Sequence, residues 1–314
     1  MNDKMRVETS TQGNIITYKL LPEGGDGLAR RSDKGKSYFR LSGRTFRFVM
    51  PEGWRLDECH PDLVAAVAIA ICVAFPIRRL ELPFRVSRPL ANTLKESFDI
   101  ELGPVDESLE NRKQPKNGRP GLCFSGGVDS AVALLLSPAK TVPVHLDRIQ
   151  PPGGAFWGMF NVDIGRRACQ AIAETGREVY SIRTDMECVI RPVGFVNDLA
   201  IAAPLILLAD YFALDSMAFG LVLESAYLTK GWKYRQYTGS RHFRQYSRVA
   251  KQIGLPFNLV TAGLSEVATA KLALESPYFH LAQSCTRGRF GSPCLRCYKC
   301  FRKCLLETIH TGEE

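Results

Sequence analysis

The chain has 314 residues, of which 45% are hydrophobic and 23% are charged, a balance that excludes an intrinsically disordered chain and allows one large domain or two of ordinary size. The formal net charge of +9 favours anionic ligands such as ATP, pyrophosphate or RNA without choosing among them. The most apolar stretch, Leu63 to Phe75, is too short to cross a bilayer and no secretory signal is visible, so we expect no membrane partner and a cytoplasmic location.

Residues 1–104 predict a small α+β domain. Its β-type runs are bounded by Gly, Ser and Asp, which is typical of short strands. The predicted strands are 14–21, 37–41, 46–49 and 79–86, and the predicted helices are 61–75 and 90–98. No metal or nucleotide motif is visible in this part, so its role stays open; recruitment of a protein partner and formation of a homodimer are the two expectations. The polar segment 105–120, which contains Pro115, Asn117, Gly118 and Pro120, predicts a linker.

From residue 121 onward, predicted strands alternate with predicted helices. The strands are 122–124, 142–146, 179–182 and 217–221, and the helices are 131–136, 164–174 and 199–211. This alternation predicts an α/β fold with a parallel sheet covered on both faces. Ligands of such sheets bind at the carboxyl ends of the strands. The polar residues at those ends are Asp147, Arg148, Arg183, Thr184, Asp185, Glu224 and Ser225. Each is either a ligand contact or an ordinary exposed strand end.

The run SGGVDS, Ser125 to Ser130, follows the first of these strands and precedes a helix. Two glycines let backbone N–H groups approach phosphate oxygens, and the helix directs its positive end to the same place. The two serines can donate hydroxyl hydrogen bonds, and Asp129 suits a Mg²⁺ ion that bridges carboxylate and phosphate. The alternative is a Gly-Gly turn with an Asp that caps the next helix. The run is neither a Walker A loop nor a GxSxG nucleophile elbow.

Four of the ten cysteines lie close together near the C-terminal end, as Cys285, Cys294, Cys297 and Cys300, and Cys304 follows them. Closely spaced thiolates of this kind predict a structural zinc site. Disulfides and an iron–sulfur cluster are the alternatives. Basic residues around the cysteines would offset the negative charge of a zinc–tetrathiolate centre: Arg287, Arg289, Arg296, Lys299, Arg302 and Lys303.

Residues 229–251 combine basic and aromatic side chains. The basic members are Lys230, Lys233, Arg235, Arg241, Arg244, Arg248 and Lys251, and the aromatic ones are Trp232, Tyr234, Tyr237, Phe243 and Tyr246. Three interpretations stay open. The region is an RNA-binding surface, a lid that closes on ATP or another small ligand, or a solvated amphipathic helix over 240–253 with its aromatics packed inward.

The SGGVDS run resembles the pyrophosphate-binding loop (PP-loop) of the N-type ATP pyrophosphatases. That superfamily includes GMP synthetase, NAD synthetase, tRNA thiolases and 7-cyano-7-deazaguanine synthase. The resemblance implies that residues 121–314 form a PP-loop domain, which cleaves ATP to AMP and pyrophosphate with Mg²⁺ as a cofactor. The catalytic residues implied are Asp129, Ser125 and Ser130. The ATP-binding residues implied are Ser125, Gly126, Gly127, Val128, Asp129, Ser130, Asp147, Arg148 and Arg183.

The cysteine spacing is similar to that of the zinc site in 7-cyano-7-deazaguanine synthase, as is the helical stretch from Ser265 with Glu266 near its start. The similarity spans Gly121 to Cys304, and residues 1–104 are an addition to it. Two residues differ from the pattern, since Gln283 replaces a Trp and Leu264 a Lys. The second predicted strand also runs into Asp147 and Arg148 instead of a Tyr-Gly-Gln segment. ATP and Zn²⁺ therefore carry over, whereas the deazaguanine substrate does not.

The expected function is that of an AMP- and pyrophosphate-forming ligase. An acceptor carboxylate or carbonyl would be adenylated, and a nucleophile would then displace AMP to give amide- or nitrile-type chemistry. The acceptor is a deazaguanine-like purine or another small molecule. One alternative is a PP-loop enzyme that thiolates or aminates a tRNA base. Another is an accessory component that binds or modifies a protein partner.

Overall fold

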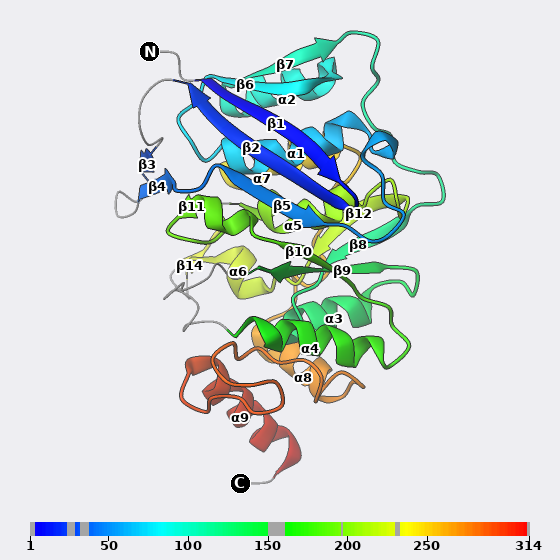
Figure 1. The fold of residues 1–314 in the computed structure, drawn as a ribbon. Helices are drawn as coiled ribbons and strands as arrows, with labels where there is room; N and C mark the ends of the chain where they lie inside the picture. The colour runs from blue at the N-terminus through cyan, green and yellow to red at the C-terminus, as the bar shows by residue number, and fades with distance from the viewer. Residues whose placement is uncertain are drawn as a thin grey trace. The chain divides into compact units, whose positions relative to one another are not determined.

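The computed structural model describes residues 4–23, 29–31, 38–149, 161–195, 197–229 and 233–312. The chain forms two compact units (Figure 1). Unit 1 comprises residues 1–118, 182–216 and 241–257, and unit 2 comprises residues 119–181, 217–240 and 258–314. The prediction of a mixed α/β chain is confirmed. Two segments expected within the C-terminal domain, 182–216 and 241–257, lie with the N-terminal residues instead, and the division into folding domains stays a prediction.

Unit 1 contains a sheet of mixed strand directions. Its strands follow the order β5 (Thr45–Val49), β2 (Ile15–Glu23), β1 (Lys4–Gln12), β6 (Arg79–Ser87) and β7 (Glu101–Asp106). The β5–β2 and β2–β1 pairs are antiparallel, and the β1–β6 and β6–β7 pairs are parallel. β10 (Tyr180–Thr184) pairs with β5 through Arg183 and Thr184. In a second small sheet of unit 1, β4 (Tyr38–Leu41) lies between β3 (Ala29–Arg31) and β11 (Ile190–Arg191).

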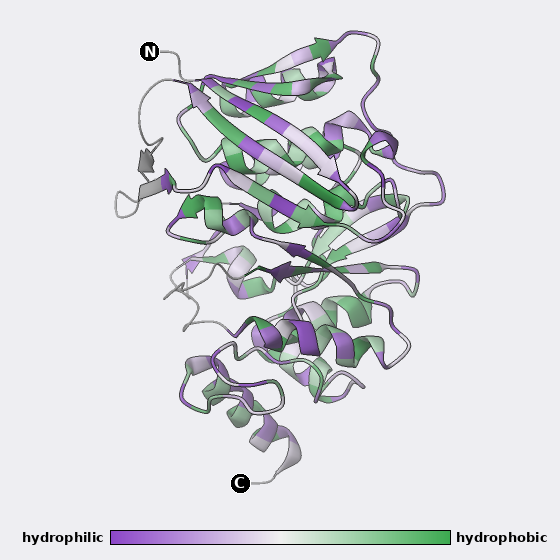
Figure 2. Ribbon diagram, in the orientation of Figure 1, coloured by the Kyte–Doolittle hydropathy of each residue, from purple (hydrophilic) through white to green (hydrophobic). Residues whose placement is uncertain are grey.

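The core of unit 1 is built on α1 (Pro61–Cys72). Every residue from Asp62 to Cys72 is buried, and α1 packs against α5 (Asp198–Leu207) and β6; Figure 2 shows the apolar composition of α1 and α5. The side chain of Asn197 caps α5 and donates a hydrogen bond of 2.7 Å to the carbonyl of Ala70 in α1. Asp62, which is fully buried, accepts hydrogen bonds from the amide and hydroxyl of Ser87, the residue that caps α2 (Arg88–Phe98). Polar caps thus fix the helix ends around an apolar interior.

Unit 2 contains the parallel pair β8 (Arg119–Cys123) and β9 (Val142–Arg148), with β12 (Leu214–Phe219) on the other side of β8. The helices of this unit are α3 (Val128–Leu136), α4 (Val162–Ala173), α6 (Leu223–Tyr227), α8 (Glu266–Leu274) and α9 (Tyr298–Thr311). A hydrophobic cluster around Leu122 and Phe124 joins β8 to α3 and α4. A short antiparallel pair, β13 (Leu228–Thr229) with β14 (Lys233–Tyr234), follows α6. Further along the chain come α7 (Arg241–Gln252), which belongs to unit 1, and then β15 (Phe257–Asn258). No helix among the described residues is both long and apolar enough to cross a bilayer.

The predicted elements correspond to observed ones, although the sequence interpretation missed β1, β7 and α9 and the short elements β3, β11, α6, β13, β14 and β15. In β1 only Met5 and Val7 are buried, so most of the strand is polar and its alternation is weak. The predicted linker contains the end of β7 and the start of β8. It also contains Arg112, whose side chain is only 4% exposed.

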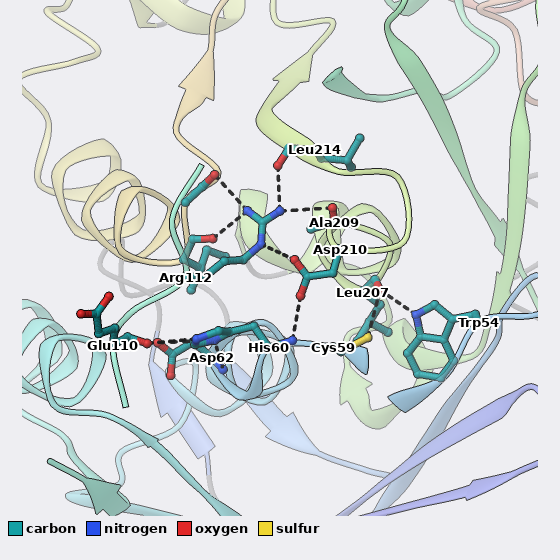
Figure 3. A network of polar contacts seen from close by, with 12 residues as sticks. Trp54, Cys59, His60, Asp62, Glu110, Arg112, Leu207, Ala209, Asp210 and Leu214 are labelled. Carbon is teal, nitrogen blue, oxygen red and sulfur yellow. Dashed lines mark hydrogen bonds and ion pairs between the residues drawn. The ribbon is translucent and has the colours of Figure 1, made fainter. Parts of the chain in front are cut away.

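Arg112 connects separate segments of unit 1 (Figure 3). Its Nε donates a hydrogen bond of 2.6 Å to Asp210. Its two terminal nitrogens donate to four backbone carbonyls, those of Ile253, Gly254, Ala209 and Leu214. The other carboxylate oxygen of Asp210 accepts the backbone N–H of His60 at 2.7 Å. A buried guanidinium with every donor direction in use is expensive to remove, because its partners are left without hydrogen bonds.

We expect Arg112→Met to lower the free energy of unfolding by about 3–5 kcal/mol, because it leaves a carboxylate and several carbonyls unpaired. The measurement is urea denaturation followed by circular dichroism. Arg55→Met is the matched control: Arg55 pairs with Asp57 at an exposed position, and we expect no measurable change. Equal stability of the two variants would contradict this role of Arg112.

Candidate functional site

The SGGVDS loop lies between a buried strand and a helix, as expected. The amide of Phe124, at the end of β8, donates a hydrogen bond of 2.9 Å to Val144 of β9. The loop then turns into α3, whose N-terminal cap is Gly127 with φ −87° and ψ 166°. Gly127 has no side chain to cap this helix end, but the hydroxyl of Ser284 accepts the amide of Val128, the first residue of α3, at 3.4 Å. Such an end is suited to an anionic ligand.

Glycines permit the close packing around this loop. Gly126 has φ +77°, and a Cβ atom there would lie 2.9 Å from the Cβ of Ala168 in α4. At Gly165, also in α4, a Cβ atom would lie 2.9 Å from the ring of His145. At Gly220, just after β12, it would lie 2.7 Å from the backbone nitrogen of Ser130. Larger residues at any of these positions would force the loop away from its neighbours.

The two serines of the loop have different surroundings. Ser130 is buried, donates a hydrogen bond of 2.9 Å to the carbonyl of Gly127, and lies 3.0 Å from the hydroxyl of Ser125. Its hydroxyl also accepts the amide of Ser125 at 3.3 Å. Ser125 is exposed. Ser130 therefore fixes the shape of the loop, and Ser125 is the hydroxyl that a ligand can reach directly.

Asp129 is half-buried in the first turn of α3 and accepts a hydrogen bond of 2.9 Å from the hydroxyl of Thr269 in α8. Burial raises the pKa of its carboxyl above the usual value. The Thr269 hydrogen bond and the cations Lys299 and Arg302 of α9 oppose this rise, and Glu224 of α6 adds to it. Asp129 is thus a carboxylate with low solvation and nearby cations, a setting that favours metal or ligand binding.

Glu224, which raises the pKa of Asp129, is connected to a further carboxylate residue, Glu266. Glu224 accepts the backbone N–H of Glu266 at 2.9 Å, and Glu266 forms an ion pair with Arg302. Arg302 also lies over the ring of Tyr298, 4.5 Å from its centroid. Sequence reasoning had assigned Lys299 and Arg302 to the charge of the cysteine centre. In the structure they also lower the pKa of the loop carboxylate, Asp129.

The strand-end residues predicted for ATP do not share one environment. Asp147 of β9 is buried and forms two hydrogen bonds, of 2.8 and 3.1 Å, with the guanidinium of Arg166 in α4. Its carboxylate is therefore engaged by the protein itself. Arg148 is half-buried at the end of the same strand. Arg183 belongs to unit 1, where its strand pairs with β5. Binding of ATP by these three residues stays a prediction.

His145 lies in β9, two residues before Asp147. It was not predicted from the sequence to be a site residue. It is buried, and its Nδ1 donates to the carbonyl of Phe124 at 3.0 Å. Burial lowers the pKa of its imidazole, which outweighs the opposing effects of that hydrogen bond and of Asp147. The ring is therefore neutral at pH 7 and supports the loop from beneath, in contact range of Gly165.

The four predicted metal-binding cysteines converge. The sulfur atoms of Cys285, Cys294, Cys297 and Cys300 all lie within 4.8 Å of one another. Three of the separations are 3.5, 3.8 and 3.9 Å. These are far longer than the roughly 2.0 Å of a disulfide. They are close to the ~3.8 Å between sulfurs that a tetrahedral ion with bonds of about 2.3 Å requires. The group suits one metal ion.

The chain turns tightly between the first two cysteines. Arg289 and Ser292 form an isolated antiparallel bridge, and a Cβ atom at Gly288 would lie 2.3 Å from the carbonyl oxygen of Ser292. Burial acts to raise the pKa of Cys285, but hydrogen bonds from the backbone N–H groups of Cys294 and Arg287 lower it to about 6. The site therefore presents a ready thiolate, the form that binds metal.

The segment before the first cysteine lies directly against the loop. The amide of Gln283 donates a hydrogen bond of 3.1 Å to the carbonyl of Gly126. The hydroxyl of Ser284 accepts the amide of Val128 at 3.4 Å. Beyond Cys285, the carbonyl of Thr286 accepts the amide of Asn161, which caps α4. The cysteine centre thus fixes a segment that contacts both the loop and α4.

The basic aromatic region divides between the two units. Residues 229–240 belong to unit 2, and Lys230 and Trp232 lie outside the described residues. In unit 1, α7 has the predicted amphipathic character. Tyr246 is buried, 5.3 Å from the ring of Phe98, whereas four cations are exposed at helical spacing: Arg241, Arg244, Arg248 and Lys251. RNA binding by this face stays a prediction.

Residues 245–314 match the model described as Family of unknown function (DUF6395). The matched segment contains α8, the four cysteines and α9, and the SGGVDS loop lies outside it. No curated protein matches the chain.

We expect Gly126→Ala to destabilise the chain more than Gly176→Ala does. Both glycines have positive φ, +77° and +88°, so both variants carry the backbone cost of about 1 kcal/mol. Only Gly126 also meets another atom within 3 Å, which adds about 1–3 kcal/mol of overlap. Urea unfolding of the two variants measures the difference. Equal losses would show that the loop does not need this close approach to α4.

Proposed function

We propose that the chain is a PP-loop enzyme that cleaves ATP between its α and β phosphates and adenylates an acceptor. The observation that carries this proposal is the SGGVDS loop at the N-terminal end of α3, where Gly127 has no capping side chain, with Asp129 half-buried beside Lys299 and Arg302. The backbone N–H groups at the start of α3 and the exposed hydroxyl of Ser125 would bind the β and γ phosphates. Asp129 and its neighbour Glu224 would hold Mg²⁺, whose charge offsets that of the phosphates.

The reaction forms one bond and breaks another at the α phosphorus. An oxygen of the acceptor, from a carboxylate or a carbonyl, attacks this phosphorus as the bond to the β-phosphate oxygen breaks and pyrophosphate leaves. Lys299 and Arg302 lie close enough to Asp129 to affect its titration, and they would stabilise the negative oxygens that crowd together in this step. A nucleophile then displaces AMP from the acceptor, and with ammonia the product is an amide.

Nitrogen is favoured over sulfur as the incoming atom. Cys188, which follows β10, is a free cysteine that sulfur chemistry would require to be reactive. Burial, aided by Glu187 and Asp185, raises the pKa of this thiol to about 11. It is therefore protonated and weakly nucleophilic at pH 7. The acceptor itself is proposed only by class, as a deazaguanine-like purine or another small molecule with a carboxylate or carbonyl oxygen.

We further propose that the four cysteines hold a structural Zn²⁺ ion. Sulfurs that lie within 4.8 Å of one another suit one ion better than an iron–sulfur cluster, whose four thiolates are divided among two or four iron atoms. Four protein ligands leave no open position for a substrate. The contribution of this centre to ATP chemistry is then positional. It fixes Gln283 and Ser284 against the loop. It also holds the first turn of α9, the helix that contains Lys299 and Arg302.

We expect release of pyrophosphate from ATP and Mg²⁺ to depend on an acceptor and to fall about 100-fold or more in Asp129→Asn, since charge stabilisation of this kind is worth that much. The acceptor panel contains 7-carboxy-7-deazaguanine with ammonium, and bulk tRNA. Asp57→Asn, at an exposed position of unit 1, is the control and should retain full activity.

Each acceptor identifies a different function. Release with the deazaguanine supports the small-molecule reaction, and release with tRNA alone supports base modification. Release of inorganic phosphate in place of pyrophosphate would contradict the PP-loop assignment. ATP binding that Asp129→Asn leaves unchanged would contradict the proposed role of this carboxylate.

We expect one zinc ion per chain by elemental analysis, lost in Cys297→Ser and retained in Cys304→Ser, since Cys304 is exposed and outside the converged group. Metal removal should increase hydrogen exchange of the amides in 125–130, because the segment that contacts the loop is released. A brown iron chromophore, or exchange in the loop that chelation leaves unchanged, would contradict the assignment.

A further inference from the structure

The exposed side of α7, a helix of unit 1, carries a row of four cations: Arg241, Arg244, Arg248 and Lys251. They are spaced by three, four and three residues, so they lie on one face of the helix, within about 80° of one another. The rise of an α-helix places the first and the last about 15 Å apart along its axis. The row is therefore straight, narrow and of a single charge.

The cations of this row have no carboxylate partner within the described part of the chain. The carboxylate of Asp198, in α5, lies 3.3 Å from a ring nitrogen of His242 instead. The sequence contains no acidic residue from Ser225 to Ser265, so α7 has no acidic side chain of its own. The row is thus free to bind an anion from outside unit 1.

The opposite side of α7 is fixed inside unit 1. Tyr246, Val249 and Ala250 are buried, and α7 packs against α2 and α5. The guanidinium of Arg112 donates hydrogen bonds to the carbonyls of residues 253–254, directly after the helix. The four cations are therefore presented from a rigid support, which lowers the entropic cost of binding.

The row of cations weakens the helix that contains it. Like charges three and four residues apart repel one another on a helix surface. Arg241 and Arg244 also lie in the first turn, where the positive end of the helix dipole disfavours cations and no acidic residue offsets them. A helix that is merely solvated usually mixes charges of both signs. This unfavourable arrangement indicates an anionic partner.

We propose that this face of α7 binds the phosphate backbone of a double-stranded nucleic acid, whatever its base sequence. A duplex carries one negative charge per about 1.7 Å of its axis, so the row faces the phosphates of about four base pairs. Three of the four cations are arginines, whose planar guanidinium donates two parallel hydrogen bonds to a phosphate. Contacts with phosphates alone carry no base preference.

The aromatic rings of α7 favour a duplex over a single strand. Proteins that bind single strands stack unpaired bases on exposed rings. In α7 the ring of Tyr246 lies 5.3 Å from that of Phe98, and the ring of Phe243 lies 5.9 Å from that of Phe257. The exposed ring of His242 contacts Tyr246 at 4.7 Å. The rings are thus engaged within unit 1, whereas the cations face outward.

A membrane surface and an acidic protein are the rival partners. A helix that binds a membrane inserts apolar side chains beside its cations, and the centre of a protein interface is apolar. The exposed residues of α7 are all polar, namely Arg241, His242, Arg244, Arg248 and Lys251. A face that offers only charge suits a regular row of phosphates better than either rival.

We expect the full chain to bind labelled RNA and DNA duplexes of about 20 base pairs, as measured by fluorescence anisotropy between about 50 and about 200 mM NaCl. Four phosphate contacts predict a slope of about −3.6 for log K against log salt, so affinity falls about 100-fold over this range. Arg244→Gln/Arg248→Gln should reduce the slope by about half, since each phosphate contact contributes about one. It should also weaken binding at least tenfold at the lower salt concentration.

Two further double variants make the test specific. Arg6→Gln/Arg55→Gln removes the same two charges from exposed positions of unit 1 at which each arginine pairs with a carboxylate, and it should leave the slope unchanged. Arg244→Lys/Arg248→Lys keeps the charge and should keep the slope. The urea midpoint of Arg244→Gln/Arg248→Gln should equal or exceed that of the wild type, because repulsion within α7 is relieved.

Five results would overturn the proposal. Three concern nucleic acid: no salt-dependent duplex binding, equal losses in Arg244→Gln/Arg248→Gln and Arg6→Gln/Arg55→Gln, or tighter binding to a single strand than to both duplexes. A lower urea midpoint in Arg244→Gln/Arg248→Gln would show that unit 1 needs these cations for its own stability. Binding to phosphatidylserine vesicles or to polyglutamate, but not to duplexes, would assign the face to a membrane or an acidic protein.

A preference for the RNA or the DNA duplex would identify the source of the backbone, and either preference supports the proposal. The binding assay contains no ATP. Its failure would therefore leave the proposed ATP chemistry intact, and failure of that chemistry would leave duplex binding intact.

Discussion

The convergence of four thiols on one point determines the geometry of the candidate site in unit 2. Cys285 is followed by a tight turn at Gly288, and Cys300 lies in the first turn of α9. The residues on either side of the centre contact the loop on one side and its carboxylate on the other. Gln283 and Ser284 contact the backbone of 126–128, and Lys299 and Arg302 influence Asp129. A metal ion there would stabilise all of these contacts together.

The loop itself depends on close backbone packing rather than on charged side chains. Gly126, Gly165 and Gly220 leave no room for a Cβ atom, and Ser130 uses its hydroxyl inside the loop. The N-cap residue of α3 is Gly127, whereas side chains of Ser87, Asn161, Asn197 and Ser265 cap α2, α4, α5 and α8. A helix that begins at a glycine leaves N–H groups of its first turn for an anion, which is the reason this geometry favours phosphate binding.

The sequence predicted most elements because their signals are local. The apolar run of α1, the strand before SGGVDS and the cysteine spacing can all be recognised within about a dozen residues. The failures have a common physical origin. β1 has few buried residues, so its alternation is weak, and α9 exposes several large apolar side chains, so polarity does not indicate which of its sides is buried. Arg112 stood in an apparent linker, and only its hydrogen bonds with distant carbonyls show that it belongs to a core.

By itself the sequence determined the residue types at two places: a glycine- and serine-rich turn with one carboxylate, and four cysteines whose spacing suits one ion. Tertiary structure decided what those residues contact. Thr269 donates a hydrogen bond to Asp129, 140 positions away in the chain. Arg166 donates hydrogen bonds to the carboxylate of Asp147, which was expected to bind ATP. The tertiary structure also left four apolar side chains of α9 exposed. Spacing along the chain fixes local geometry, whereas hydrogen-bond partners and burial depend on which distant segments pack together.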